Sequence, residues 1–402
     1  MKKLRLLLLA LPILILSACS DSQDYSEQAN QLAQSFIIVD THVDVPYRLK
    51  NNWEDISMRT EEGQFDYPRA KEGGLDAPFM SIYIPASYQE KGGAKAVADS
   101  LIDMINKITD EHPDKFAIAT SPEEIKQQHE NGLISLPMGM ENGAPIGDDL
   151  SNVEYFFDRG IRYITLTHSK DNQISDSSYD TTYTHNGLSS FGEEVVKEMN
   201  RIGMMVDISH VSDSAFYDVM EITNAPAIAS HSSARHFTSG FERNMSDDMI
   251  KSLAENEGVI MINFGSNFLE ESSRESSTQI REHIGNWLEK NELERSDSTA
   301  QAYIDEYRSE NYKYSTTSKV ADHIDHVVNL VGIDHVGLGS DYDGVGDTLP
   351  VGLKDVSDYP NLIEELLERG YSESDIEKIC SGNIFRVWNE VSDIAEEMQA
   401  QS

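Results

Sequence analysis

Short apolar runs rich in β-branched residues alternate along this chain with longer stretches whose apolar positions recur at helical spacing. Eight runs have the length and composition of buried strands: Phe36–Val45, Ala77–Pro85, Leu133–Asn142, Ile161–Ser169, Met204–Ser212, Pro226–Ser232, Val259–Gly265 and His335–Gly344. The helical stretches between them include Ala96–His112, Phe191–Ile202, Ser214–Ile222, Asp247–Asn256 and Val320–Val331. Strands that alternate with helices indicate βαβ units and a parallel sheet.

Eight such units predict an α/β fold of the (β/α)8 or TIM barrel type, which takes about 250 residues plus insertions. We expect this domain to span residues 35–395. A doubly wound open sheet is the alternative architecture. Its dinucleotide-binding form is disfavoured because no GxGxxG motif follows the first run.

One segment, residues 266–319, does not fit the repeat and falls between the seventh and eighth runs. It is long, polar and charged, with scattered aromatic residues, and we expect it to be a helical insertion. It could cover the barrel mouth or form a dimer contact, or it could be a solvated excursion of the chain. Beyond the eighth run, residues 372–391 predict a further helix with Ser372 as its N-cap.

The first residues, 1–19, have the features of a bacterial lipoprotein signal peptide. A positively charged start (MKKLR) precedes the apolar run Leu6–Leu16, and the segment ends in LSAC. We expect Cys19 to be acylated, which would anchor the protein to the membrane of the cell envelope. An ordinary cleaved signal peptide with an accidental cysteine is the alternative. Residues 20–34 would then form a polar tether.

Composition and charge narrow the class of partner. The 402 residues include 32 Lys and Arg against 70 Asp and Glu, a net charge of −38. Nucleic acid is not an expected partner, because its phosphate backbone requires a cationic face. The hydrophobic fraction of 39% is consistent with a folded core. The two cysteines cannot supply a disulfide scaffold.

Polar residues follow the apolar runs at their carboxyl ends, where a (β/α)8 barrel assembles its active site. They are His42, Asp44, Glu141, His168, His210, His231, Asp341 and Asp343. Imidazole and carboxylate groups together favour a transition-metal site. Five of them could hold two metal ions with one carboxylate as a bridge: His42, Asp44, Glu141, His210 and His231. A buried polar network without metal is the alternative, and it would need many well-placed partners.

Six separated segments resemble the membrane (renal) dipeptidase family of binuclear zinc peptidases. They are DTHVD, GMENG, YITLTHS, MMVDISHVS, IASHSSA and GLGSDYDG, and they occur in the family's order. The resemblance extends from about Phe36 to Val391. It implies that His42 and Asp44 bind a first zinc ion, and that Glu141 bridges to a second. The ligands of that second zinc would be the pair His210 and His231, listed above.

The resemblance also implies roles for three further residues. His168 would bind and polarise the scissile carbonyl, and Asp341 would handle the catalytic proton. Arg243 would hold the carboxylate at the C-terminus of the substrate, with Arg235 as a rival because the intervening segment is a residue longer than the family pattern.

The expected function is therefore zinc-dependent hydrolysis of dipeptides, including ones with a C-terminal D-residue, by a hydroxide held between two zinc ions. The resemblance also implies a homodimer. Two other functions stay open on the sequence. One is a different amidohydrolase-type reaction, such as N-acyl amino acid deacylation or lactone hydrolysis. The other is a non-catalytic lipoprotein that binds peptides or metal.

Overall fold

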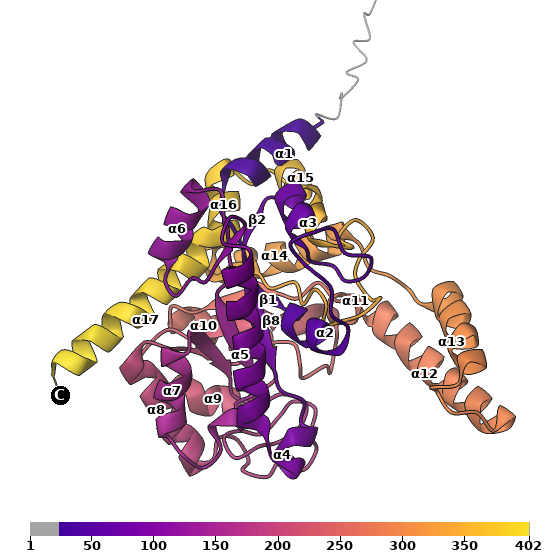
Figure 1. The fold of residues 1–402 in the computed structure, drawn as a ribbon, viewed down its shortest axis with the longest axis horizontal. Helices are drawn as coiled ribbons and strands as arrows, with labels where there is room; N and C mark the ends of the chain where they lie inside the picture. Colours follow the sequence, from indigo (N-terminus) through magenta and orange to yellow (C-terminus); the bar gives the residue numbers. More distant parts are fainter. Residues whose placement is uncertain (1–23, 402) are drawn as a thin grey trace, which may run out of the picture.

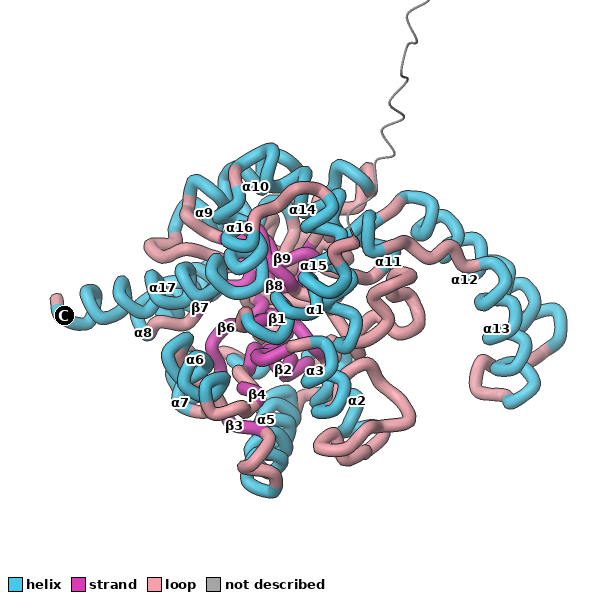
Figure 2. Tube along the Cα trace, turned by 90° about the horizontal axis from the view of Figure 1, so that it is seen from above, coloured by secondary structure: helices cyan, strands magenta, loops and turns pink. Residues whose placement is uncertain are grey.

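A computed structural model describes residues 24–401 and contains one parallel eight-stranded sheet. Its strands are β1 (Ile38–Val43), β2 (Leu75–Tyr83), β5 (Met138–Glu141), β6 (Ile161–Thr165), β7 (Met205–Asp207), β8 (Ile228–Ser232), β9 (Val259–Ile262) and β10 (Val336–Leu338). They follow one another in the sheet in chain order, without the reversal of a doubly wound sheet. The predicted (β/α)8 barrel is confirmed (Figures 1 and 2).

The first and last strands meet at their carboxyl ends. The amide of Asp44 donates to the carbonyl of Tyr342 at 2.8 Å, and the amide of Asp341 donates to the carbonyl of His42 at 3.1 Å. This link nearly closes the sheet into a barrel, and it is made by residues of the predicted site.

Most of the predicted strands end earlier than expected, and for two of them the backbone shows why. The runs that contain His210 and Asp341 stop at Asp207 and Leu338, because both residues have positive φ angles, 69° and 65°. A left-handed backbone cannot continue a strand. Both side chains therefore lie in turns beyond the strands.

The third predicted strand, Leu133–Asn142, is two strands in the structure. Its first part, β4 (Ile134–Ser135), pairs with β3 (Phe116–Ala117) in a separate two-stranded sheet. Pro137 separates β4 from β5, since proline has no N–H to donate to a neighbouring strand.

Helices surround the barrel. Their bounds are α1 (Ser26–Ser35), α2 (Val45–Asn51), α3 (Tyr67–Gly73), α4 (Ser87–Lys91), α5 (Ala94–Glu111), α6 (Pro122–Glu130), α7 (Ser151–Asp158), α8 (Ser190–Ile202), α9 (Asp213–Ile222), α10 (Asp247–Glu255), α11 (Ser266–Leu269), α12 (Glu271–Asn291), α13 (Ser298–Asn311), α14 (Thr317–Val331), α15 (Tyr359–Glu368), α16 (Glu373–Glu377) and α17 (Asn383–Ala400). The five helices predicted between the strands match α5, α8, α9, α10 and α14. Serine hydroxyls cap three of them, α8, α9 and α10, by accepting a backbone N–H of the first turn.

Helix α17 closes the amino-terminal end of the barrel. Its apolar side chains pack in one buried cluster against strand residues, several of which lie near the starts of their strands. Trp388 is 1% exposed and lies against Phe79, with ring centroids 5.3 Å apart. Phe79 in turn contacts Tyr163, which belongs to the same interior cluster. The apolar contacts with α17 are thus at the amino-terminal end of the barrel, and the polar residues of the predicted site are at the opposite end.

The C-terminal tail is helical, as predicted, and is longer than expected. Ser372 caps α16 in a reciprocal box with Asp375. A π-helical turn over Lys378–Gly382 then leads into α17, which continues to Ala400 and projects from the barrel at its C-terminal end (Figure 1).

The insertion is helical, as predicted, and comprises α11, α12 and α13. Figure 2 shows α12 and α13 pointing away from the strands as an arm, so its tip does not cover the barrel mouth. Stacked rings join the two helices, with centroids 4.0 Å apart for Trp287 and Tyr303 and 3.9 Å apart for His283 and Tyr307. Only the base of the insertion, through Phe268 of α11, lines the cavity at the mouth.

The N-terminal predictions have different outcomes. The signal peptide and Cys19 lie outside the described residues. The tether expected over residues 20–34 is wrong for Ser26–Gln34, which belong to α1 and bury Ala29, Leu32 and Ala33. Among residues 24–401, the helices lack the combination of length and apolar character that crossing a bilayer requires.

We expect Trp388→Ala to lower the free energy of unfolding by about 3–5 kcal/mol, because it leaves a cavity where α17 closes the barrel. Chemical denaturation followed by circular dichroism measures the change. Trp53→Ala is the matched control, since Trp53 is 53% exposed, and it should change stability by less than about 0.5 kcal/mol. Equal losses in the two variants would show that α17 does not stabilise the barrel.

Candidate metal centre

The carboxyl ends of the strands bring together six predicted side chains. They are His42 of β1, Asp44 just after it, Glu141 at the end of β5, and His168, His210 and His231 after or within β6, β7 and β8. All except His168 are less than 9% exposed. The convergence predicted from the sequence is therefore present in the structure.

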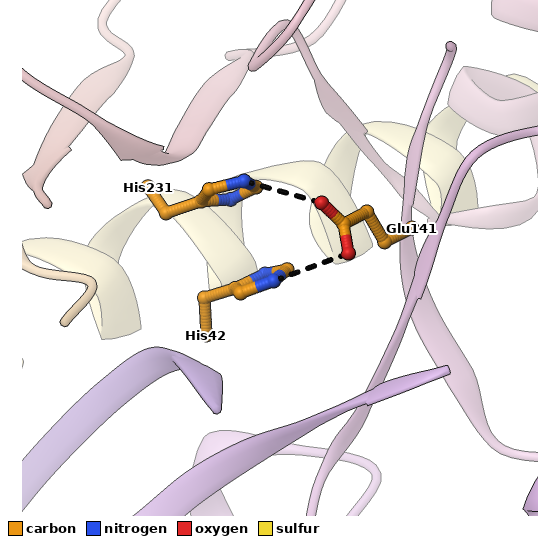
Figure 3. Close-up of side chains that lie close together, drawn as sticks. All are labelled: His42, Glu141 and His231. Carbon is orange, nitrogen blue, oxygen red and sulfur yellow. Dashed lines mark ion pairs between the residues drawn. The ribbon is translucent and has the colours of Figure 1, made fainter. Parts of the chain in front are cut away.

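The carboxylate of Glu141 lies at the centre of this group. Its Oε2 is 3.5 Å from Nε2 of His42, and its Oε1 is 3.4 Å from Nε2 of His231 (Figure 3). The same Oε1 is 3.1 Å from Nε2 of His210. The two oxygens thus face different imidazoles. A carboxylate divided in this way could contact two cations at once.

The spacing of the donor atoms fits metal coordination. Nε2 of His42 lies 3.5 Å from Oδ2 of Asp44, and the Nε2 atoms of His210 and His231 are 2.9 Å apart. Ligand bonds of about 2.0–2.1 Å at tetrahedral angles place neighbouring donors about 3.3–3.4 Å apart. The 3.5 Å separation matches this spacing, whereas the 2.9 Å separation is shorter and is a hydrogen-bond distance. Groups of three donors within 4.8 Å of one another include His42 with Glu141 and His231, and His42 with Asp44 and Asp341.

The alternative of a metal-free polar network leaves buried atoms without partners. Among the described residues, Nε2 of His42 and Oδ1 of Asp44 are buried and have no hydrogen bond. Buried polar atoms are nearly always hydrogen-bonded, so two orphans aimed into one cluster need an explanation. A divalent cation supplies it, because it binds the lone pairs of both.

Hydroxyl groups behind the cluster fix the tautomers of two imidazoles. The Tyr163 hydroxyl donates to the carbonyl of Thr41 and lies 2.9 Å from Nδ1 of His42. Having used its proton, the hydroxyl can only accept one from Nδ1. In the neutral imidazole, Nε2 of His42 is therefore the unprotonated nitrogen, and its lone pair faces the cluster.

His231 is held in the same way through Ser230 and Asp207. The Ser230 hydroxyl donates to Oδ2 of Asp207 at 2.6 Å and accepts from Nδ1 of His231 at 2.7 Å. Asp207 ends β7 and also accepts the Thr165 hydroxyl. Tyr163, Asp207 and Ser230 were not predicted as site residues, although they lie in the quoted segments YITLTHS, MMVDISHVS and IASHSSA.

The electrostatics differ between the imidazoles. Burial would lower the pKa of His42, but Tyr163, Glu141 and Asp44 raise it well above its usual value. Burial, together with the positive charge of Arg243, holds the pKa of both His210 and His231 well below its usual value, so both are neutral at pH 7. Burial alone would raise the pKa of Glu141, but His42 and His168 hold it well below its usual range. The carboxylate is therefore ionised.

His168 and Asp341 line a cavity of about 510 Å³ at the barrel mouth, together with Tyr83 and Tyr179. His168 has its Nε2 3.5 Å from Oε1 of Glu141, while its buried Nδ1 has no hydrogen-bond partner among residues 24–401. Burial lowers the pKa of His168. A neutral imidazole that borders both the cluster and the cavity can donate a hydrogen bond to a ligand.

Asp341 is oriented by Asn263, which the sequence analysis missed. The Asn263 amide donates to Oδ2 of Asp341 at 2.8 Å, and its carbonyl accepts the amide of Gly265. Burial, and then the negative charge of Asp44, raises the pKa of Asp341 well above its usual value. The position of Asn263 directly after β9 was the available signal, but an amide is neither a typical metal ligand nor an acid or base.

Gly344 lies between the carboxylates of Asp44 and Asp341, where no side chain would fit. A Cβ atom at this position would lie 2.1 Å from Oδ2 of Asp44 and 2.2 Å from Oδ1 of Asp341. The neighbouring Asp343 does not join the cluster. Its carboxylate pairs with Nε of Arg48 at 3.0 Å instead.

The two candidate arginines occupy different environments. Arg235 forms a bidentate pair with Asp213, with N–O distances of 2.7 and 2.5 Å. Arg243 is buried, and it donates to the Ser232 hydroxyl and the His231 carbonyl. Its guanidinium lies 5.4 Å from the ring centre of Phe268, a residue that lines the cavity. Arg243 is thus the arginine beside the cluster.

Comparisons with known proteins agree with this geometry. A family model described as membrane dipeptidase (peptidase family M19) matches residues 26–402. Dipeptidase 3 of Mus musculus is 32% identical over 387 residues, which cover 94% of this chain and 69% of that protein. The crystal structure of the probable dipeptidase PvdM from Pseudomonas aeruginosa has a TM-score of 0.79 at 26% identity, over 92% of this chain and 98% of that one.

A third similar protein shares the fold at lower identity. It is a metallopeptidase from Rhodobacter sphaeroides, solved with a phosphinate mimic of the dipeptide L-Ala-D-Ala, with a TM-score of 0.73, 24% identity and coverage of 89% of this chain and 99% of that chain. The family match spans nearly all the described residues, including every side chain of the cluster. The chain therefore belongs to the membrane dipeptidase family, peptidase family M19, and is a metallo-dipeptidase.

Proposed function

We propose that this metallo-dipeptidase binds two zinc ions and hydrolyses the amide bond of dipeptides. One observation carries the proposal: the two oxygens of Glu141 face different donor sets. His42 and Asp44 would hold one ion, and His210 and His231 the other. The mixed imidazole and carboxylate donors suit zinc.

Zinc, when bound, acts as a Lewis acid and lowers the pKa of a coordinated water toward about 7, so that a nucleophile exists at neutral pH. The protein supplies the proton transfers. The raised pKa of Asp341 makes its carboxylate a stronger base than that of an ordinary aspartate, so it can take the proton of the attacking water. The carboxylic acid formed in this way can then deliver that proton to the leaving amine. Asn263 orients the carboxylate for this role.

His168 would stabilise the transition state at the scissile carbonyl. Its imidazole borders the cavity, and it lies against the ring of Tyr83 at a centroid distance of 4.8 Å. A hydrogen bond aimed at a developing oxyanion typically contributes about 3 kcal/mol. The contact with Tyr83 holds the ring in position.

Arg243 would recognise the free carboxylate of the substrate. A guanidinium has five N–H donors, and the two contacts to Ser232 and His231 leave others free, including a buried Nε without a partner. Bidentate pairing with a carboxylate requires the cleaved residue to be C-terminal. This excludes substrates that extend beyond the cleaved residue on its C-terminal side.

The stereochemistry of the second residue belongs to the same proposal. The Rhodobacter sphaeroides protein was solved with a mimic of L-Ala-D-Ala, which motivates including C-terminal D-residues in the substrate class. A panel of L-L and L-D dipeptides, with N-acyl amino acids and lactones beside them, separates this proposal from the other amidohydrolase-type reactions. Turnover of the dipeptides also distinguishes an enzyme from a peptide-binding lipoprotein.

We expect Glu141→Gln to lower the zinc content and to reduce dipeptide hydrolysis at least on the order of 10²–10³-fold, the loss typical of removing one electrostatic contact from an active site. Metal analysis and steady-state kinetics measure the two effects. Glu72→Gln is the control, since its exposed side chain pairs only with Arg59 on the surface. Full zinc content and full turnover in Glu141→Gln would refute the bridging role.

We expect Arg243→Lys to raise KM for dipeptides about 10–100-fold, because a hydrogen bond to a charged group contributes about 1.5–3 kcal/mol and lysine lacks the planar fork. Kinetics with dipeptides and dipeptide amides measure the effect, and the amides should lose less. Arg235→Lys is the control and should leave KM unchanged. A normal KM in Arg243→Lys would assign the clamp elsewhere.

We propose that Cys19 is acylated and anchors the enzyme in the cell envelope, on the evidence of the LSAC sequence after a short apolar run. The full chain expressed in a bacterial host should partition into the detergent phase of a Triton X-114 extract. Cys19→Ser should move it to the aqueous phase. Cys380→Ser is the control, and an unchanged partition of Cys19→Ser would exclude the lipid anchor.

A further inference from the structure

A second group of metal-binding side chains lies on the outside of the barrel. His236 belongs to the short 3₁₀ helix η2 (Arg235–Phe237), Asp247 is the first residue of α10, and His326 lies on α14. Each offers a donor atom, and these atoms all lie within 4.8 Å of one another. The group shares no residue with the candidate metal centre.

In this outer cluster, formed by His236, Asp247 and His326, the three side chains already lie close to one another. Nε2 of His326 is 2.8 Å from Oδ1 of Asp247. The ring of His236 stacks on that of His326, with centroids 4.4 Å apart and planes inclined by 24°. Phe237 contacts both imidazoles, at centroid distances of 4.9 and 5.6 Å, and restrains their positions.

An ordinary helix-end ion pair explains only part of this arrangement. Asp247 lies in the first turn of α10, where an acidic residue is favourable, and His326 can pair with it. His236 remains unexplained, because its ring nitrogens make no hydrogen bond or ion pair within residues 24–401. Its imidazole nevertheless lies beside both other donors and is open to solvent.

We propose that His236, Asp247 and His326 form a second metal site, which binds a transition-metal ion such as Zn²⁺ through two imidazoles and one carboxylate. Water would complete the coordination, because three protein ligands leave a position open. The imidazoles select zinc and related ions over Ca²⁺ and Mg²⁺, which prefer oxygen ligands. The net charge of −38 favours the approach of cations in general.

The site lies on the segment that joins two parts of the catalytic machinery. His236 is in the loop between β8, which carries His231, and the position of Arg243. The same loop is already tied to α14 one helical turn before His326. There the amide of Ala234 donates to Nδ1 of His323 at 3.0 Å, and the other nitrogen of that ring lies 3.1 Å from the carbonyl of Leu269.

A metal ion in the outer cluster would therefore cross-link this loop to α10 and α14. Binding to the folded state alone stabilises a protein in proportion to the logarithm of ligand concentration. The outer site would thus raise the thermal stability of the enzyme and would hold the loop that carries Arg243. It would not take part in the reaction itself.

The test compares zinc binding by the full chain with that of two variants, His236→Gln and His326→Gln. Each protein is loaded with zinc, washed with a weak chelator, and titrated with ZnCl₂ in a calorimeter while metal content is measured. We expect the wild type to bind one zinc equivalent more than either variant, and to gain a few degrees in Tm from it that the variants do not gain. Dipeptide hydrolysis at saturating zinc should be the same in all three.

His283→Gln is the matched control, since His283 is stacked on Tyr307 in the insertion arm and should keep the extra equivalent. Because the readout is a difference of one equivalent between proteins, it does not depend on how many ions the main centre holds. The proposal is overturned if the wild type and the variants bind equal amounts of zinc. It is also overturned if one of the two variants alone keeps the extra equivalent, since the histidine replaced in that variant would then not be a ligand.

Discussion

The contact of one carboxylate with imidazoles from several strands is the interaction on which this structure depends. Glu141 lies where the ends of β1, β5, β7 and β8 converge, and its negative charge is stable there only because positive or polar groups surround it. The parallel strands must close for these groups to meet. The hydrogen bonds between the end of β1 and the turn after β10 nearly complete that closure, and residues of the same site make them.

The polar centre is supported by groups behind it that are themselves satisfied. The hydroxyl groups of Tyr163 and Ser230 each donate a hydrogen bond to a fixed acceptor, so each can only accept a hydrogen bond from an imidazole. The result is that His42 and His231 present lone pairs inward. A set of ligands without these hydroxyl groups would have no defined tautomer, and metal affinity would fall.

One end of the barrel contributes to stability, and the other end carries the candidate site. The amino-terminal end is apolar, and Trp388 of α17 packs there against the interior. The carboxyl end holds the cavity, the carboxylates and the turns with positive φ angles at His210 and Asp341. Stability and chemistry can therefore vary independently, as is general for this fold.

The sequence by itself determined the fold class, because eight apolar runs that alternate with amphipathic helices leave few other parallel architectures. It also determined which side chains are candidate metal ligands, because they lie at the carboxyl ends of those runs. Only the tertiary structure decided how the oxygens of Glu141 divide, that Arg243 rather than Arg235 lies beside the cluster, and that the insertion points away from the mouth. The physical reason is that strand periodicity is local. Contacts between side chains more than a hundred residues apart depend on closure of the barrel, which no short segment encodes.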